Sequence, residues 1–221
     1  MENNRCFNNI TKEDGTQANL IKLIRNESIG NYSWSDGINQ WENSTIMKLL
    51  NNKYFNDFFY NNSRNAIEGV NWNIAGTTTS NILYKEFYQF ERGTTTYDKY
   101  NTKWLGKVGL IYPSDYGYAT SGGFNLSRKD CLNLSAESWH ETSAEDCRVN
   151  NYLFDEGYYY WTMTLVTSDK SSVFRVDDNG HVCDALISWS DFRTYPSLYL
   201  KADILITGGT GSSEEPYMLG L

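Results

Sequence analysis

The chain has 221 residues, of which 40% are hydrophobic and 15% aromatic, and its formal net charge is -8. Such a composition is typical of a folded chain, and the length suits one sizeable core, so we expect a single domain over residues 1–221. The negative charge argues against nucleic acid and anionic membranes as partners, because phosphate binding needs clustered Lys and Arg. No apolar run approaches the roughly 20 residues of a membrane span, so we expect no membrane insertion of this domain.

The N-terminal part is predicted to contain a pair of strands. The first residues, Met1 to Asn4, do not resemble a secretory signal, and we expect an export signal or anchor to have been removed ahead of them. Strands are predicted at Arg5–Asn8 and at Asn19–Arg25, because the turn residues Lys12-Glu13-Asp14-Gly15 lie between them. A loop from Gly30 to Trp41 follows.

A helix is predicted after this loop, and Ser44 is suited to be its N-cap. Apolar residues then recur at spacings of three and four and form one face, which consists of Ile46, Leu49, Leu50, Tyr54 and Phe58. A stripe of this kind packs against a sheet far more often than it forms a groove for a partner, and we expect the packed arrangement.

The middle of the chain gives weaker signals. Residues Arg64–Trp72 are predicted to form a second helix, whereas periodicity leaves Asn81–Phe90 open as a helix or a strand. Trp104–Ile111 is predicted to be a buried strand. The segment after it, Tyr112–Thr120, is predicted to be a loop whose three Tyr residues either form a sticky surface or seal the loop against the body. We expect sealing.

The four cysteines lack the paired short spacings of zinc sites. Cys131 and Cys147 bracket a short polar segment around Trp139, and a disulfide that closes such a loop contributes roughly 3 kcal/mol of stability. We therefore predict this bridge, with free buried thiols as the alternative; a bridge indicates folding in an oxidising compartment. The states of Cys6 and Cys183 stay open.

The C-terminal part is predicted to consist mainly of strands. Three β segments, Trp161–Val166, Ser172–Val176 and His181–Leu186, precede a polar and aromatic loop and a last strand at Ser197–Ile206. The sequence Asp177-Asp178-Asn179-Gly180 joins the second and third segments. Its Asn-Gly pair is predicted to supply the two positive-φ positions of a tight hairpin turn.

The composition between Ser171 and Leu200 is unusual, because this stretch has no Lys, Glu, Gln or Met and only one Trp, Trp189. Codons of the form AAY end in a pyrimidine, so randomising their adenines cannot produce any of those five residue types. The bias therefore fits a segment diversified by adenine mutagenesis. Strands also disfavour Lys, Glu and Gln on their own, and both explanations stay open.

The sequence contains no G-x-S-x-G, no P-loop and no H-E-x-x-H motif. Its two histidines are His140, inside the predicted disulfide loop, and His181, which we expect to be an exposed hairpin residue. The run Asp177-Asp178-Asn179 offers oxygen atoms to calcium but lacks the alternating pattern and distal Glu of an EF-hand. We predict no catalytic residues, no metal site and no cofactor.

Several short segments occur in a recognisable order: Lys22–Gly30, Gly106–Ala119, Asn151–Leu153 with Trp161-Thr162, Pro196 with Leu198–Lys201, and Thr207–Gly211 with Glu215–Tyr217. Together they resemble a family of surface-exposed domains from gut Firmicutes and related bacteria, whose members often follow a pilin-like N-terminal helix and signal. The run YPSDYGYA is the most specific part of the resemblance, which spans nearly the whole chain.

This resemblance implies an α+β fold of the C-type-lectin-like kind, shared with formylglycine-generating enzymes and with the variable proteins of diversity-generating retroelements. Its mixed, mostly antiparallel sheet pairs the two ends of the chain and carries one or two packed helices and long loops. In that fold the late β segments and their loops present the ligand surface. Retroelements randomise AAY codons in that region, which agrees with the bias between Ser171 and Leu200.

Carried over position by position, the resemblance assigns a constant frame to Val173, Phe174, Val176, Gly180 and Val182. The ligand-binding positions, which vary among relatives, are Arg175, Asp177, Asp178, His181, Asp184, Ala185, Ser188, Trp189, Asp191 and Tyr195. Side-chain alternation supports this division, because one face of a strand pair packs while the other faces outward.

The chain also departs from its relatives. They commonly carry Arg just before Pro196, where this chain has Tyr195, and the codon for Trp189 cannot end in a pyrimidine. The Glu-Pro-Asn and Gln-Pro-Asp loops of sugar-binding C-type lectins are absent, and Cys183 lacks the near partner that formylglycine-generating enzymes need. Calcium-dependent sugar binding and that enzyme activity are therefore not expected.

We predict a non-enzymatic ligand-binding domain, adhesin-like or receptor-like, on the extracellular side of a bacterial cell surface. Rigid aromatic and small polar residues suit recognition of a protein or glycan ligand. The acidic positions Asp177, Asp178, Asp184 and Asp191 favour a basic or neutral partner. The alternative is a structural subunit of a pilus or surface assembly, in which the same patch mediates self-association. An enzyme ranks third.

Overall fold

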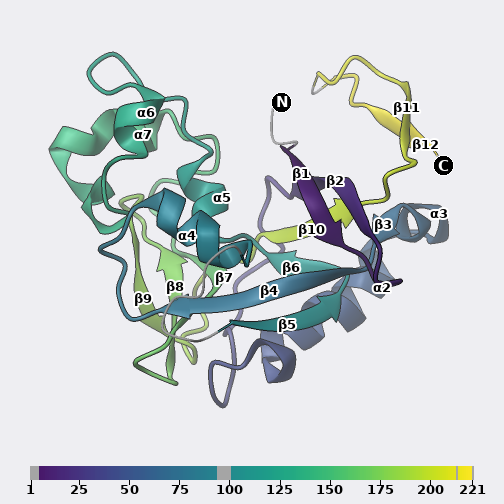
Figure 1. Ribbon diagram of the computed structural model, residues 1–221, viewed down its shortest axis with the longest axis horizontal. Helices are drawn as coiled ribbons and strands as arrows, with labels where there is room; N and C mark the ends of the chain where they lie inside the picture. Colours follow the sequence, from purple (N-terminus) through teal and green to yellow (C-terminus); the bar gives the residue numbers. More distant parts are fainter. Residues whose placement is uncertain (1–4, 94–100, 213, 221) are drawn as a thin grey trace.

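The structure is a computed structural model that describes residues 5–93, 101–212 and 214–220. Its elements form an α+β fold in which the strand pairs are mostly antiparallel, as the sequence predicts at that level (Figure 1). Two larger sheets and one separate hairpin account for the strands in the described part of the chain. The side chain of Cys6 lies outside the described side chains.

The first sheet joins the two ends of the chain. Strands β1 (Arg5–Thr11) and β2 (Gln17–Ile24) form the predicted antiparallel pair, and β2 pairs with β10 (Pro196–Leu200). The other edge of β10 pairs with β6 (Val108–Leu110) and then with β3 (Ile67–Glu68). Every residue of β10 is buried, because Tyr199 packs in the main core and Leu198 and Leu200 pack in a separate cluster.

The second sheet positions the predicted site. Its strands lie in the order β5 (Asn101–Gly106), β4 (Val70–Thr77), β7 (Tyr160–Val166), β8 (Ser172–Val176) and β9 (Val182–Leu186). The pair of β4 and β7 is parallel and the others are antiparallel. All residues of β7 are buried, since both faces of this sheet are covered.

A helical segment of three parts covers one face of that sheet: α1 (Thr45–Lys48), the π-helical η2 (Leu49–Tyr54) and α2 (Phe55–Phe58). The Ser44 hydroxyl accepts the N–H of Met47 at 3.2 Å, which confirms the predicted N-cap. Ile46 and Leu50 are fully buried, but Phe58 is 50% exposed. Tyr54 is half-buried against the same core, so the predicted apolar face packs up to the end of the π-helical part and not at Phe58.

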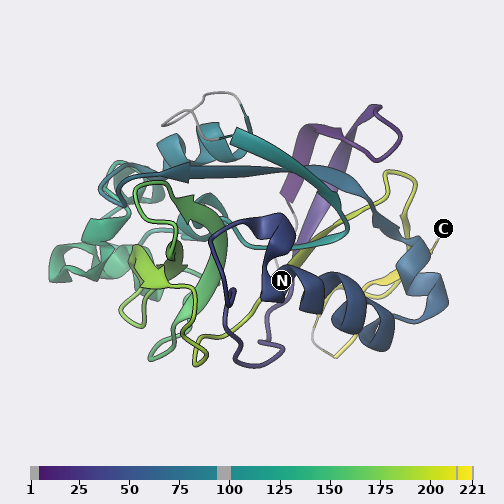
Figure 2. The ribbon, with the colours of Figure 1, turned by 90° about the horizontal axis from the view of Figure 1, so that it is seen from below.

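The opposite face of the sheet carries α4 (Tyr84–Glu91), α5 (Pro113–Gly117) and the segment that contains the disulfide. Figure 2 shows α4 on one side of the long strand β4 and the helical segment 45–58 on the other. The segment Asn81–Phe90, for which the sequence left helix and strand open, thus forms a helix over most of its length. Tyr112 and Tyr116 are buried, so the predicted sealing is confirmed, although the segment forms α5 rather than a loop.

The disulfide segment contains α6 (Arg128–Cys131), η3 (Glu137–His140), η4 (Thr142–Ala144) and α7 (Glu145–Val149). The sulfur atoms of Cys131 and Cys147 are 2.06 Å apart, which is the distance of the predicted disulfide. Both residues are fully buried, as is Trp139 between them. The disulfide therefore closes a loop in which the side chain of Trp139 is the large buried residue.

Two predictions in the middle of the chain were wrong. In place of a helix at Arg64–Trp72, α3 (Asn61–Asn65) ends and strands β3 and β4 begin. Buried and half-buried residues alternate from Val70 to Ile74, which is the period of a strand. The predicted single strand Trp104–Ile111 is divided at Lys107 into β5 and β6, which belong to different sheets.

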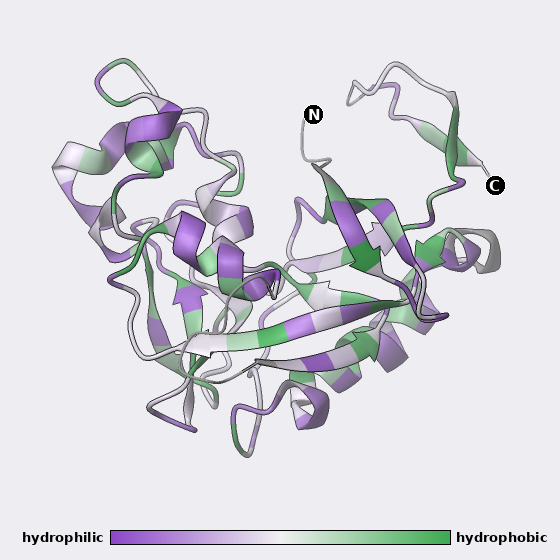
Figure 3. Ribbon diagram, viewed as in Figure 1, coloured by the Kyte–Doolittle hydropathy of each residue, from purple (hydrophilic) through white to green (hydrophobic). Residues whose placement is uncertain are grey.

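The predicted last strand, Ser197–Ile206, was also too long. The strand ends at Leu200, and after a turn β11 (Leu205–Gly208) pairs with β12 (Met218–Gly220) as a separate hairpin. This hairpin projects from the end of the first sheet (Figure 1). Figure 3 shows apolar residues on it, away from the body of the protein.

Candidate functional site

The hairpin between β8 and β9 carries the first of the predicted site residues. The Asp177 N–H donates to the His181 carbonyl at 2.8 Å, and the Gly180 N–H donates to the Asp177 carbonyl at 2.9 Å. Gly180 has a φ of +76°, but Asn179 does not have a positive φ, so the prediction of two such residues was wrong at Asn179. A type I turn followed by one left-handed glycine forms the loop instead.

Arg175 lies inside the protein at the end of β8. Its guanidinium is 4.5 Å from the ring centroid of Tyr159 and 5.1 Å from that of Phe192. Its Nη1 is 2.6 Å from Oδ2 of Asp177, and the two side chains are only 12% and 9% exposed. Two predicted ligand contacts, Arg175 and Asp177, therefore pair with each other and pack against the body.

The neighbouring carboxyls of Asp177 and Asp178 differ in acidity. Burial by itself would raise the pKa of Asp177, but hydrogen bonding with Asp178 and Asn179 and the charge of Arg175 lower it to about 2. The hydrogen bond with Asp177 raises the pKa of Asp178 above its ordinary value. Asp178 also accepts the Tyr159 hydroxyl at 3.0 Å. Asp177 is thus the stronger acid of the two.

His181 and Cys183 lie beside Asp177. The Nδ1 atom of His181 is 3.8 Å from Oδ1 of Asp177, and the His181 side chain is 18% exposed, so the prediction of an exposed histidine was wrong. The ring of His140, 4.8 Å away between centroids, covers it. The Cys183 Sγ is 3.8 Å from Oδ2 of Asp177, and burial raises the pKa of this thiol to about 12. A thiol that stays protonated is a weak nucleophile.

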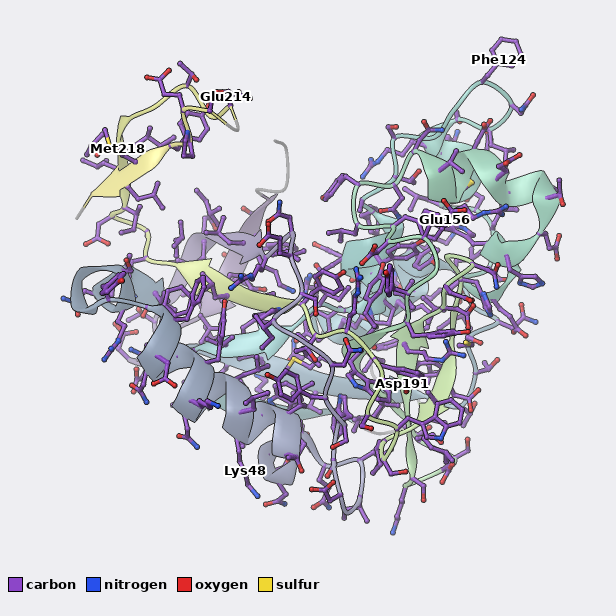
Figure 4. All side chains as sticks on the ribbon, turned by 180° about the vertical axis from the view of Figure 1, so that it is seen from behind. Lys48, Phe124, Glu156, Asp191, Glu214 and Met218 are labelled. Carbon is purple, nitrogen blue, oxygen red and sulfur yellow. A yellow bond between two sulfur atoms is a disulfide. The ribbon has the colours of Figure 1, made fainter. Side chains whose placement is uncertain are left out.

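Four predicted site residues face the solvent: Asp184, Ser188, Trp189 and Asp191. The Trp189 side chain is 45% exposed, and its ring lies 5.6 Å from that of Phe192. Figure 4 labels Asp191, which lies in the loop beside β8 and β9. We call these four residues the exposed tip. They combine one aromatic ring, one hydroxyl and two carboxylates; Asp184 lies at the middle of β9, and the other three residues lie in the loop that follows this strand.

The loop that carries most of the exposed tip is held by backbone hydrogen bonds to the N-terminal segment. The Ile187 carbonyl accepts the N–H of Trp34 at 2.9 Å, and the Phe192 carbonyl accepts the N–H of Tyr32 at 3.2 Å. Further along, the Thr194 N–H donates to the Gly30 carbonyl at 3.1 Å. A binding surface on a backbone fixed in this way loses little conformational entropy on association.

Two further residues of the predicted site, Ala185 and Tyr195, are buried. Ala185 is 3% exposed, because it pairs with Val173 across the hairpin and packs in the core. Tyr195 is 8% exposed, and its hydroxyl hydrogen-bonds to the Asp155 carboxylate. A direct contact between Ala185 and a large ligand is therefore not possible in this structure.

Tyr195 borders a pocket of about 480 Å³ whose other walls come from residues 24–31 and 152–155. Asp155 and Arg193 form an ion pair at this pocket, and the Arg193 guanidinium packs over the ring of Tyr158. Sequence reasoning missed Asp155 and Arg193, because neither belongs to a motif. The only available signal was that Arg193 lies in the loop assigned to ligand binding.

The residues assigned to the constant frame are buried. Val173, Phe174, Val176 and Val182 have exposed fractions of 1% or less, and Val173 and Phe174 pack in different core clusters. Strand β8 is thus covered on both faces, and the expectation of one outward face was wrong for it. The segment with the disulfide packs on the side of Phe174 and Val176, and Tyr159 and Phe192 cover the side of Arg175, which alternation left open.

Comparisons with protein-family models, with curated proteins and with solved structures find no match to this chain. Among residues 5–93, 101–212 and 214–220, no helix has the length and apolar character that a membrane crossing requires. The geometry of the residues themselves therefore carries the functional argument.

Proposed function

We propose that this chain is a non-enzymatic ligand-binding domain, adhesin-like or receptor-like, displayed on a bacterial surface. The observation that carries the proposal is the exposed tip: Trp189 with Ser188, Asp184 and Asp191 on a backbone fixed to the N-terminal segment. An exposed indole gives a large contact area at low entropic cost, and the polar neighbours provide directional hydrogen bonds.

A C-type-lectin-like fold is part of this proposal. Support comes from the pairing of β2 with β10, which joins the two ends of the chain, and from the helices on both faces of the second sheet. The disulfide between Cys131 and Cys147 supports an extracellular location, because such bonds persist in oxidising surroundings.

The chemistry of the exposed tip suggests the class of ligand. Its two carboxylates, Asp184 and Asp191, have no cationic partner among the ion pairs of the described residues. A protein or glycan surface with basic or neutral groups complements such a patch. The net charge of -8 opposes binding of nucleic acid.

Diversification by a retroelement is also part of the proposal, in a narrower form. Asp184, Ser188 and Asp191 can change without loss of packing because they face solvent, whereas Arg175, Asp177, Ala185 and Tyr195 contribute to the buried frame. Trp189 lies outside the set of diversified positions, since its codon does not end in a pyrimidine. Sequencing of the gene in several isolates tests this. Differences concentrated in the exposed positions, next to a template repeat and a reverse transcriptase, are expected; an invariant segment with no retroelement nearby contradicts diversification.

Ligand binding is tested by probing the purified chain on a glycan array and on an array of cell-surface proteins, followed by interferometry of the strongest hit. Trp189→Ala and Asp191→Ala are expected to weaken binding at least tenfold while thermal stability is unchanged. Phe124→Ala is the matched control, because Phe124 is 99% exposed and lies on a distant loop (Figure 4). Equal losses in all three variants, or none, would reject the exposed tip as the binding surface.

The projecting hairpin favours a second candidate, a structural subunit of a surface assembly. Three apolar side chains of this hairpin are largely exposed: Leu205 by 65%, Ile206 by 62% and Met218 by 61%. Apolar side chains on a two-stranded hairpin are normally buried against another element or a partner. Figure 4 places Met218 at the opposite end of the molecule from Phe124. Sedimentation at micromolar concentrations distinguishes the candidates: self-association abolished by Leu205→Ser with Ile206→Ser supports assembly, and a monomer at all concentrations counts against it.

A further inference from the structure

We propose that Asp177, His181 and Cys183 form a binding site for a divalent transition-metal ion of the zinc type. This site lies at the turn between β8 and β9 and at the start of β9, and it does not depend on the proposed ligand-binding function. It differs from the sequence-based expectation of no metal site. The three side chains offer one carboxylate oxygen, one imidazole nitrogen and one sulfur, which is a donor set that zinc accepts and that calcium and magnesium do not favour.

The geometry of the three side chains is close to that of a tetrahedral site. All three donor atoms lie within 4.8 Å of one another. The His181 Nδ1 is 3.8 Å from one oxygen of Asp177, and the Cys183 Sγ is 3.8 Å from the other. Zinc bonds of 2.0–2.3 Å place tetrahedral donors roughly 3.3–3.7 Å apart. The two contacts with Asp177 are thus close to that range, and metal binding requires the three side chains to rotate toward a common point.

An unpartnered atom points to a missing ligand. The Nδ1 of His181 is buried and makes no hydrogen bond in the structure. Buried polar atoms are nearly always satisfied, so an orphaned nitrogen that faces a carboxylate and a thiol needs an explanation.

The surrounding charges favour a divalent cation. Arg175 is the only cation in direct contact with the three ligands among the described residues, and its contact is with Oδ2 of Asp177. Asp178 adds a second carboxylate. Glu137, which lies in η3 near His181, adds a more distant one. When a metal displaces the thiol proton of Cys183, the two positive charges of the ion and that of Arg175 balance Asp177, Asp178 and the thiolate.

Arg175 also has a positioning role in this site. Its guanidinium packs against the stacked rings of Tyr159 and Phe192 and pairs with Oδ2 of Asp177, which fixes the carboxylate. Partners of this kind orient a ligand for the metal and raise its affinity. The ring of His140 packs on the ring of His181 and restricts its rotation, while its own Nδ1 bonds the Glu137 carbonyl at 2.6 Å. We therefore place His140 outside the ligand set.

Titration of the whole 221-residue chain, stripped of metal and with Cys183 shown to be free by thiol assay, tests the site. Zn²⁺ competed against a chromophoric chelator is expected to bind in a 1:1 ratio with a Kd below about 1 μM. Co²⁺ is expected to give the thiolate-to-metal absorption band that only sulfur ligation produces. Zn²⁺ is also expected to protect Cys183 from a thiol reagent, and millimolar Ca²⁺ is expected not to compete.

Variants assign the ligands. Cys183→Ser and His181→Asn are each expected to weaken Zn²⁺ binding at least tenfold, and Cys183→Ser to remove the cobalt band. Glu42→Gln is the control, since Glu42 is an exposed acid outside the hairpin and outside the exposed tip, and affinity within threefold of the parent is expected. Near-ultraviolet circular dichroism in chelator checks that every variant is folded as the parent is.

Three outcomes would overturn the proposal. The first is a Co²⁺ complex of the parent without the sulfur band, because Cys183 is then no ligand. The second is a loss in His140→Asn as large as in His181→Asn, which assigns binding to the two stacked histidines and not to Asp177 and Cys183. The third is competition by Ca²⁺ at equal concentration, which assigns binding to the acidic turn.

Discussion

Lys22 and Asp115, 93 positions apart in the sequence, form an ion pair of 2.5 Å in which the side chains are 1% and 2% exposed. The pair links β2 of the first sheet to α5, which covers the second sheet. Arg92 at the end of α4 is 3.1 Å from the other oxygen of Asp115. Burial lowers the pKa of Lys22 to about 8, and although burial would raise that of Asp115, the two cations hold it below its ordinary value.

Removing Asp115 should destabilise the protein strongly. Asp115→Ala leaves Lys22 and Arg92 buried without their carboxylate, and the expected loss is about 3–5 kcal/mol of unfolding free energy. Urea denaturation followed by tryptophan fluorescence measures it. Asp14→Ala is the control, because Asp14 pairs with Lys12 at the surface, and a loss below about 1 kcal/mol is expected there. Similar losses in both variants would mean that burial of the pair does not matter.

Glu91 should make stability depend on pH. This carboxyl is buried, accepts the Ser114 N–H at 3.2 Å and the Thr164 hydroxyl at 3.0 Å, and burial raises its pKa to about 7 from 4.5. Between these two values the folded state binds more protons than the unfolded state, so the unfolding free energy falls as pH rises.

The test compares the parent with Glu91→Gln. Relative to this variant, the parent is expected to lose roughly 3 kcal/mol between pH 4.5 and 7, since each tenfold change in proton affinity corresponds to about 1.4 kcal/mol. Glu42→Gln, at an exposed position, serves as the control and should follow the parent. A constant difference between parent and Glu91→Gln across this range contradicts the raised pKa.

Features that depend on local sequence could be predicted. Ser44 caps its helix because Ser is suited to the exposed N–H groups of the first turn, whatever lies around it. The position of the β8–β9 turn followed from Asn179-Gly180, although only Gly180 takes a positive φ. Cys131 and Cys147 could be paired because their spacing allows a short loop.

Features that depend on long-range packing could not be predicted. Residues Trp104 to Ile111 form one apolar run, but Val108–Leu110 pairs with β10 while Asn101–Gly106 pairs with β4, and no local signal marks that division. At the site, the alternation of side chains along a strand assigns Arg175 and Phe174 to opposite faces of β8. It cannot show that both of these faces are covered by other parts of the protein. Arg175 and Asp177 therefore looked like surface residues, whereas Asp184 on β9 is one.

The disulfide should provide a measurable share of stability. Double replacement Cys131→Ala with Cys147→Ala opens a loop of 16 positions, and the expected loss is about 3 kcal/mol, because the unfolded chain regains the entropy of that loop. Thermal unfolding of the parent and the double variant measures the difference. Cys183→Ser, assayed without metal, is the control and should stay within about 1 kcal/mol of the parent. An equal melting temperature for parent and double variant contradicts a stabilising bridge.

A substitution at Arg175 tests whether this side chain stabilises the β8–β9 hairpin or is free to contact a ligand. Arg175→Ala removes the cation that packs against Tyr159 and Phe192 and leaves Asp177 buried without its partner, so a loss of about 2–4 kcal/mol is expected. Arg175→Lys should recover only part of it, because an ammonium group cannot stack as a planar guanidinium does. Asp191→Ala, at the exposed tip, is expected to change stability by less than about 0.5 kcal/mol. If Arg175→Ala is as stable as the parent in urea, the residue is free to serve as a ligand contact, and the frame of the hairpin must be held by Val173, Phe174 and Val176 alone.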